Sequence, residues 1–378
     1  MIVKRVPIDT YCEKKVPTLQ KTYDGLIDYL DISSVDNAEK RIISYQTIRS
    51  SNAPSRAKQL LKKGDVLVST VRPNLNAVAV VEEETENLMV GSTGYCVLRC
   101  KENIDVRYLF NFCQSQYFID DMSSQATGAS YPAVSNSIVR NSLIPCHSIE
   151  EQRKIAEKID TVSELIAFRK QQLVELDELV KSRFIELFGL PVSNSKGWNT
   201  EKMREVAPTV NYSGGFEDTV WLLNLDMVEA QTGRILDYLY VNEEEVGNST
   251  CTFDTTNVLY SKLRPYLNKV VIPDRCGYAT SELIPLKPNP MKLERTYLAF
   301  MLRSDEFVNM INEKVAGAKM PRVSMSDFRE FDVPVPPMEL QKQFDAFVEQ
   351  PDKSKLAVQQ SIAELEELKK SLMQKYFG

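Results

Sequence analysis

The residue types that usually carry out catalysis are few in this sequence. His147 is the only histidine, and it lies in the PCHS junction at 145–148, where a structural or exposed role is expected. Asp352, Glu367 and Lys369 loosely resemble an acidic nuclease cluster, but they fall within one expected helix that separates the two carboxylates by about 22 Å. Two-metal sites need ligands within a few ångströms. The sequence also lacks a GxxxxGK[ST] phosphate loop, a GxSxG elbow, a GxGxxG turn and an HExxH helix. We therefore expect no catalytic site.

The most informative feature is an internal duplication. TGASYPAVS at 127–135 and AGAKMPRVS at 316–324 have the same shape and lie 189 residues apart, and Gly189 and Gly378 have the same separation. A period this long is outside the range of about 20–50 residues that is typical of stacked repeats, so it indicates a duplicated domain. A second matching pair is GDVLVSTVRPN at 64–74 and NVLYSKLRP at 257–265.

Each half begins as a mixed α/β domain. Two β-branched runs surround Arg72-Pro73 in the first half and Arg264-Pro265 in the second, which predicts consecutive strands. Proline cannot donate to a strand ladder, so each pair is expected at a strand end or edge, with the arginine in an extended conformation. A helix is then predicted over 107–122 and its twin over 295–311, followed in each case by the glycine-containing loop.

Two long helices are predicted, from Ile149 to Phe188 and from Met338 to Phe377. The first contains no glycine or proline, and Gly189 and Gly378 follow the two helices as C′ residues would. Each helix would be about 60 Å long, and heptad-like seams favour an antiparallel pair. Either the pair acts as a spacer between the domains, or it is a hairpin that only stabilises the fold. The seams consist of Ile155, Ile159, Val162, Ile166, Leu173, Leu176, Leu179 and Leu187 in the first helix and Phe344, Phe347, Val358, Ile362, Leu365, Leu368 and Leu372 in the second.

Pro351 is the irregular residue of the second helix, because Val162 stands at the matching position of the first. An interior proline removes a backbone hydrogen bond at a cost of about 3 kcal/mol, so a kink or restart is predicted near 350–353. The predicted fold class is α+β. The predicted domains are 1–148 and 190–337, and the predicted spacer helices are 149–189 and 338–378.

The composition is that of an ordinary globular protein. Hydrophobic residues make up 43% and charged residues 26%, and the net charge is −6. The charge is uneven: acidic runs occupy 82–86 and 243–245, whereas 46–80 carries one acid, Asp65, against six basic residues.

Seven cysteines without a CxxC pair predict reduced thiols. No apolar run approaches 18 residues, so a cytoplasmic location is expected. The six basic residues of the stretch 46–80 are Arg49, Arg56, Lys58, Lys62, Lys63 and Arg72.

The duplicated segments carry a family resemblance over essentially the whole chain. They include TGASYPAVSNSIVRNSLIP at 127–145, SIEEQRKIAEKID at 148–160, AGAKMPRVSMSDFREFDVPVPP at 316–337 and MELQKQFDAFVEQ at 338–350. In combination they resemble the DNA-specificity (S) subunits of Type I restriction-modification systems. Pro351 departs from the pattern, where an aliphatic residue is expected.

The resemblance implies a non-catalytic subunit. Each domain would be a target-recognition domain that reads one half of a bipartite, interrupted site in double-stranded DNA. The helices would set the spacing and dock two DNA methyltransferase subunits, with two restriction subunits able to join. S-adenosylmethionine, ATP and Mg would belong to these partners, and none to this chain. We expect no membrane partner and no metal site. The candidates for partner docking lie at the helix starts: Gln152, Ile155, Gln341 and Phe344.

The candidate DNA contacts lie in the duplicated segments. Arginine, lysine and amide side chains suit base edges, and serine and backbone amides suit phosphates. Residues shared by both halves are expected to bind phosphate or support the fold, and the unshared ones to read sequence. The alternatives are a scaffold that presents two protein-binding domains and an independent nuclease, which the absence of an acidic or histidine site disfavours. The candidates are Arg72, Asn74, Asn76, Ser130 and Tyr131 in the first half and Lys262, Arg264, Tyr266, Asn268, Lys319 and Arg322 in the second.

Overall fold

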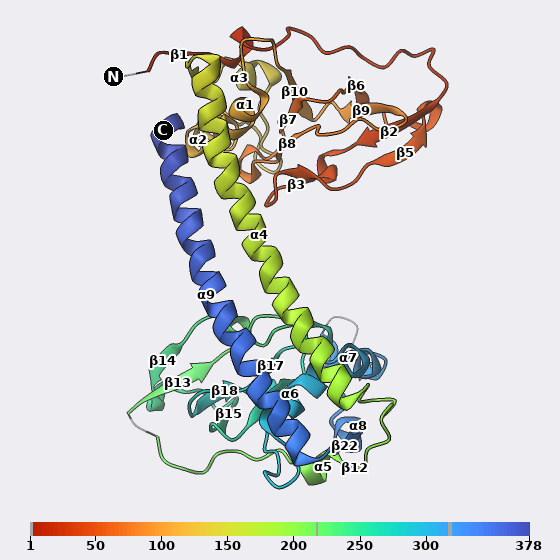
Figure 1. The fold of residues 1–378 in the computed structure, drawn as a ribbon, viewed down its shortest axis with the longest axis vertical. Helices are drawn as coiled ribbons and strands as arrows, with labels where there is room; N and C mark the ends of the chain where they lie inside the picture. Colours follow the sequence, from red (N-terminus) through yellow and green to blue (C-terminus); the bar gives the residue numbers. More distant parts are fainter. Residues whose placement is uncertain (1–2, 217, 317–319) are drawn as a thin grey trace. The chain divides into compact units, whose positions relative to one another are not determined.

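The computed structural model describes residues 3–216, 218–316 and 320–378, and the chain forms two compact units. Unit 1 joins residues 1–170 to residues 359–378, and unit 2 is residues 171–358. Two helices of 40 residues, α4 (Ile149–Phe188) and α9 (Met338–Phe377), contribute to both units (Figure 1). The predicted α+β fold, with a long helix after each duplicated domain, is confirmed.

Unit 1 contains a four-stranded sheet, β5-β2-β9-β6, and a three-stranded antiparallel sheet, β10-β7-β8. Strand β2 is parallel to β9 and antiparallel to β5. Every residue of β7 and β10 is buried, and the two charged residues, Asp65 and Arg99, form an ion pair with each other at 2.8 Å. The elements of this unit are β1 (Arg5–Pro7), β2 (Leu26–Leu30), β3 (Val35–Asp36), β4 (Arg41–Ile42), β5 (Gln46–Arg49), β6 (Ala57–Leu60), β7 (Asp65–Ser69), η4 (Pro73–Leu75), β8 (Val78–Val80), β9 (Leu88–Ser92), β10 (Tyr95–Arg99), α1 (Val106–Phe112), α2 (Gln116–Ser124), α3 (Asn136–Asn141) and β11 (Leu143–Pro145).

Unit 2 repeats this arrangement with a four-stranded sheet, β14-β13-β18-β15, and a three-stranded sheet, β17-β16-β19. Strand β13 is parallel to β18 and antiparallel to β14, as β2 is to β9 and β5. The elements are β12 (Thr200–Lys202), α5 (Met203–Val206), β13 (Thr219–Leu223), β14 (Leu239–Asn242), β15 (Thr250–Phe253), β16 (Val258–Ser261), η7 (Pro265–Leu267), β17 (Val270–Val271), β18 (Gly277–Thr280), β19 (Leu283–Leu286), α6 (Arg295–Arg303), α7 (Asp305–Asn312), β20 (Val315–Ala316), β21 (Arg322–Val323), α8 (Met325–Arg329) and β22 (Asp332–Pro334).

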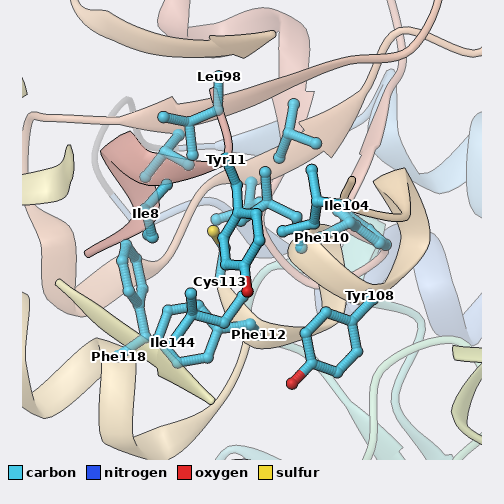
Figure 2. Packing of buried hydrophobic residues seen from close by; sticks show 14 of the residues in the cluster. Ile8, Tyr11, Leu98, Ile104, Tyr108, Phe110, Phe112, Cys113, Phe118 and Ile144 are labelled. Atoms are coloured by element: carbon cyan, nitrogen blue, oxygen red, sulfur yellow. The ribbon is translucent and has the colours of Figure 1, made fainter. Parts of the chain in front are cut away.

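Each core contains side chains from both long helices. In unit 1, Ile155 and Ile159 of α4 and Phe377 of α9 join the main hydrophobic cluster, part of which Figure 2 shows around Tyr11. In unit 2, Phe188 of α4 and Phe344 of α9 have the same role. The start of one helix therefore packs beside the end of the other in each unit, so the paired segments run antiparallel, as predicted.

The prediction of a single helix in each domain is wrong, because a serine divides this segment into two helices. Ser115 separates α1 from α2, and its Oγ accepts a hydrogen bond from the Phe118 backbone N–H at 3.2 Å. Ser304 separates α6 from α7 in the same way, with a bond of 3.3 Å from Phe307. A serine that caps a new helix stabilises its first turn, which offsets the interruption.

Of the kink or restart predicted near 350–353, the restart is wrong. Helix α9 continues through Pro351, whose side chain is buried in unit 2. Val348 on the preceding turn belongs to the hydrophobic core. Packing of this face holds the proline in the helix despite the lost backbone hydrogen bond.

Candidate nucleic-acid interface

Each unit has a short turn with left-handed residues at both ends, which we call the Arg-Pro turn (residues 72–76 and 264–268). Arg72 (φ 50°, ψ 61°) and Asn76 (φ 48°, ψ 52°) flank η4. Arg264 (φ 50°, ψ 63°) and Asn268 (φ 50°, ψ 50°) flank η7. The prediction that the arginines are extended is therefore wrong. A left-handed residue before proline is unfavourable, so its occurrence in both units indicates that the surroundings impose it.

The glycine-containing loop (residues 127–135 and 316–324) imposes this conformation through backbone hydrogen bonds. In unit 1 the Arg72 N–H donates to the Pro132 carbonyl at 2.7 Å, and in unit 2 the Arg264 N–H donates to the Pro321 carbonyl at 2.8 Å. Gly128 has a φ of 107°, and a Cβ there would lie 2.9 Å from the Tyr131 carbonyl oxygen. The two duplicated sequence segments therefore form one substructure in each unit. Gly317 and Lys319 lie outside the described residues.

Asn76 and Asn268 are buried and support the turn from beneath, so the structure corrects their assignment as DNA contacts. The Asn76 amide donates to the Cys113 carbonyl at 2.8 Å, and the Asn268 amide donates to the Arg303 carbonyl at 2.9 Å. Asparagine tolerates the left-handed conformation better than most residues, which explains its place at the end of both turns.

The hydrogen bonding of the buried asparagine differs between the two turns at its side-chain oxygen. In unit 1, Lys40 Nζ donates to the backbone oxygen of Asn76 at 2.5 Å and to its side-chain oxygen at 3.0 Å. Burial, together with the nearby Lys369 charge, lowers the pKa of Lys40 to about 8. In unit 2 the buried Oδ1 of Asn268 has no hydrogen-bond partner among the described residues. Lys40 cannot be identified from the sequence, because nothing in its local sequence indicates a contact 36 residues away.

Exposed side chains surround the Arg-Pro turn of unit 1. Arg72, Asn74, Ser130 and Tyr131 are all exposed, and Tyr131 is 70% accessible. The Arg72 guanidinium lies 5.0 Å from the centre of the Tyr131 ring. Within the described parts of the chain, no hydrogen bond or ion pair engages the Arg72 side chain. The structure thus brings four of the five first-half candidates to one exposed surface, with a cation and an aromatic ring side by side.

The corresponding surface of unit 2 carries different groups. Arg264 and Tyr266 are exposed, the latter by 48%, and Lys262 is half-buried. Arg322 is exposed but forms an ion pair with Glu282 at 2.9 Å, and this hydrogen bond raises the pKa of its guanidinium. A nucleic-acid contact by Arg322 would therefore compete with Glu282.

The four candidates for partner docking face the cores instead of the surface. Gln152 accepts from the Asp105 N–H at 2.9 Å, and Gln341 accepts from the Glu294 N–H at 2.8 Å. Ile155 and Phe344 are 5% and 0% exposed. Their roles are corrected: they fix the start of each long helix to the domain before it, since a buried amide must be satisfied inside the fold.

Other residues of the long helices expose apolar surface. Leu179 and Leu368, which the periodicity places in the seam, are 49% and 46% exposed. Isolated exposed apolar side chains are ordinary, whereas several that form one patch mark an interaction site. The exposed apolar residues in unit 1 are Leu165, Phe168 and Leu368, and those in unit 2 are Val174, Leu179, Ile185 and Leu356.

Metal-binding clusters and membrane-spanning helices are both absent from the described ranges. No group of three or more histidine, cysteine, aspartate or glutamate side chains could hold a metal ion in residues 3–216, 218–316 and 320–378. Among the same residues, no helix has the length and apolar character needed to cross a membrane.

Comparisons with known proteins show what the chain is similar to. The family model described as "Type I restriction modification DNA specificity domain" matches residues 10–178 and 234–367. The chain is 21% identical over 301 residues to the Type I restriction enzyme EcoDI specificity subunit of Escherichia coli, covering 68% of this chain and 67% of that protein. It is 20% identical to the MjaIX specificity subunit of Methanocaldococcus jannaschii, covering 84% and 77%.

Solved structures show the same fold. A chain from a study of complex assembly in the type I R-M system has a TM-score of 0.62 at 24% identity, covering 99% of this chain and 97% of that one. The Type I S subunit from M. genitalium has a TM-score of 0.56 at 16% identity, covering 99% and 96%.

Proposed function

Because the chain belongs to the Type I restriction-modification DNA specificity family, and is thus a non-catalytic subunit of such a complex, we propose that each domain reads one half of a bipartite, interrupted DNA site. The observation that carries this proposal is the Arg-Pro turn braced by the glycine-containing loop, which recurs with one backbone geometry in both units. Two copies of one reading surface suit two half-sites. Family membership also favours this reading over a protein-binding scaffold.

We divide the exposed residues of the turn into two roles. Arg72 and Arg264 occupy the same position and have no acidic partner within the described residues, so they bind phosphate in both half-sites. Side chains that differ between the units read sequence. Tyr131 comes from the glycine-containing loop of unit 1, whereas Tyr266 comes from the Arg-Pro turn of unit 2. The two halves of the site therefore differ in sequence.

The long helices have two roles in this proposal. They fix the separation between the two readers, and their exposed apolar residues dock two methyltransferase subunits. Phe168 in unit 1 and Leu356 in unit 2 are 63% and 67% exposed, which supports such a surface. S-adenosylmethionine binds to the methyltransferase subunits, and ATP and Mg to any restriction subunits.

Methylome sequencing of cells that carry the chain with its modification subunits tests the proposal. The expected result is adenine methylation at one sequence made of two short, different elements separated by a fixed spacer. Methylation of a single uninterrupted element, or of none, would contradict a two-domain reader.

Single substitutions test the assignment of half-sites. Tyr131→Ala should relax the sequence requirement in one element, and Tyr266→Ala in the other, because each ring contacts one half of the site. Tyr45→Ala is the matched control, since Tyr45 is a 48% exposed tyrosine of unit 1 outside the turn and the loop. Relaxation of both elements by one substitution would refute the assignment.

A further inference from the structure

Each unit has a cavity, and the backbone hydrogen bonds beside it show that the two cavities are equivalent. In unit 1 the Ile8 N–H donates to the Ser142 carbonyl at 3.0 Å, and in unit 2 the Met203 N–H donates to the Phe331 carbonyl at 2.9 Å. Arg140 and Arg329 line the respective cavities, each from the short helix after the glycine-containing loop. The volumes are about 450 Å³ in unit 1 and about 230 Å³ in unit 2.

The unit 1 cavity is lined by more cations than acids. Lys14, Lys15 and Arg140 line it with one carboxylate, Asp9, which Arg140 engages at 2.7 Å. Lys14 and Lys15 are exposed, and among the described residues neither makes a hydrogen bond or an ion pair. The cavity therefore has positive charge that no protein group balances, which favours an anionic ligand.

The other polar groups of this cavity can donate hydrogen bonds. Asn136, Ser137 and Asn141 line it with exposed amide and hydroxyl groups. Cys96 also lines it, and burial raises the pKa of this thiol to about 11, so it adds no negative charge near neutral pH. Donors of this kind bind phosphate oxygens.

The unit 2 cavity lacks the two lysines. Following the backbone correspondence of Ile8 with Met203, the positions of Lys14 and Lys15 are taken by Thr209 and Val210. Arg204 at this cavity forms ion pairs with Glu330 and Glu205. The smaller cavity of unit 2 is therefore less suited to an anion.

We propose that the unit 1 cavity binds one phosphodiester of the DNA backbone, with Lys14, Lys15 and the donors of α3 as its ligands. The inference rests on the proposed function. Helix α3 begins at Asn136, directly after the glycine-containing loop, so the cavity is continuous along the chain with the proposed reading surface. The phosphodiester occupies a site outside the Arg-Pro turn, and unit 2 has no equivalent contact through lysines.

The test is the salt dependence of duplex binding by the full chain, with Lys14→Gln and Lys15→Gln combined. One phosphate contact contributes about 0.9 to the slope of log K against log salt, so the double variant should lower the slope by about 1. The loss should be equal for a duplex that carries the site and a scrambled duplex. An unchanged slope, or a loss confined to the specific duplex, overturns the inference.

A second variant tests whether the phosphate lies in the cavity or only contacts the two lysines at the surface. Asn141→Asp places a carboxylate in the cavity with almost no change of shape, and it should weaken binding of both duplexes about tenfold or more, the equivalent of one hydrogen bond to a charged group. Unchanged affinity would place the phosphate elsewhere. Lys154→Gln with Lys158→Gln is the matched control, because it removes two exposed lysines of unit 1 outside the cavity.

Two further results distinguish this inference from others. If the wild-type chain binds the specific duplex no better than the scrambled one, the proposed function fails. If the double variant keeps both its specificity and the wild-type slope of log K against log salt, only the phosphate site in the cavity is refuted. Inorganic phosphate, titrated at constant ionic strength and followed by NMR, tests for a free-anion site. The inference would also be overturned if phosphate binds at Lys14 and Lys15 but replacing these lysines leaves the salt dependence of duplex binding unchanged.

Discussion

The two Arg-Pro turns share a backbone but differ in what lies beneath and above them. Beneath the turn, Lys40 satisfies Asn76 in unit 1, whereas the matching oxygen of Asn268 in unit 2 is without a partner among the described residues. Above it, a tyrosine from the glycine-containing loop covers Arg72, whereas in unit 2 the tyrosine is on the turn itself. Duplication thus preserved the frame that holds an arginine in a strained conformation and left the surrounding side chains free to diverge.

Equivalent cores should lie beneath the two turns, and replacing one phenylalanine in each core has the largest expected effect. Phe377 lies 5.2 Å from Tyr108 in unit 1, and Phe188 lies 4.8 Å from Tyr297 in unit 2, between ring centres. Phe377→Ala and Phe188→Ala should each reduce the stability of one unit by about 3–5 kcal/mol. Hydrogen exchange, resolved by unit, measures this. Equal loss of protection in both units from one substitution would contradict separate cores.

Replacing the asparagines tests the difference beneath the turns. Glycine tolerates positive φ at both positions. Asn76→Gly removes the two side-chain bonds, to the Cys113 carbonyl and from Lys40, and keeps the bond from Lys40 to the backbone oxygen, whereas Asn268→Gly removes one bond and an unsatisfied oxygen. Asn76→Gly should therefore be more destabilising by about 1–2 kcal/mol. Urea unfolding of both variants decides this, and equal losses would mean that the bond from Lys40 to the side-chain oxygen of Asn76 contributes nothing to the turn.

Replacing the arginines tests what the turns share. Arg72→Ala and Arg264→Ala should each lower the salt slope of DNA binding by about 1, with sequence preference unchanged, because a phosphate contact is independent of sequence. Binding to a specific duplex over a salt series measures both. A change of preferred base in either variant would show that the arginine reads sequence, and the common role would be lost.

The smallest expected effect is the pH dependence of stability that Lys40 gives to unit 1. The native pKa of Lys40 is about 8, below its ordinary value of about 10.5, so the unfolded chain binds more protons between these values. The destabilisation from the buried charge is fully present below pH 8, and stability should rise with pH from about 8 to about 10.5. Comparing the wild type with Lys40→Met by urea unfolding isolates this effect. The same pH dependence in the variant would assign it to other groups.

The sequence predicts the features that depend on long patterns. The two long helices follow from apolar periodicity over 40 residues without glycine, and this signal is strong enough that Pro351 does not interrupt the second one. The serines that divide the shorter helices give a weak local signal, because serine is tolerated within a helix as well as at its start.

The sequence does not reveal which polar residues of the turn reach the surface. Asn74 and Asn76 are two positions apart and chemically identical, yet the first is exposed and the second is buried beneath the turn. The difference depends on the left-handed conformation of residues 72 and 76, which hydrogen bonds from distant segments impose. Gln152 and Gln341 show the same limit, since their partners are backbone groups 47 residues away.

The division of the helices between the units makes the synthesis of this duplicated protein asymmetric. Unit 2 is one uninterrupted stretch, residues 171–358, so every side chain of its core is available once that stretch has been translated. Unit 1 is encoded first but also needs residues 359–378, including Phe377. Domains generally fold as their sequence becomes available. The half that leaves the ribosome first must therefore wait, with part of its apolar core uncovered, until the other half has been made.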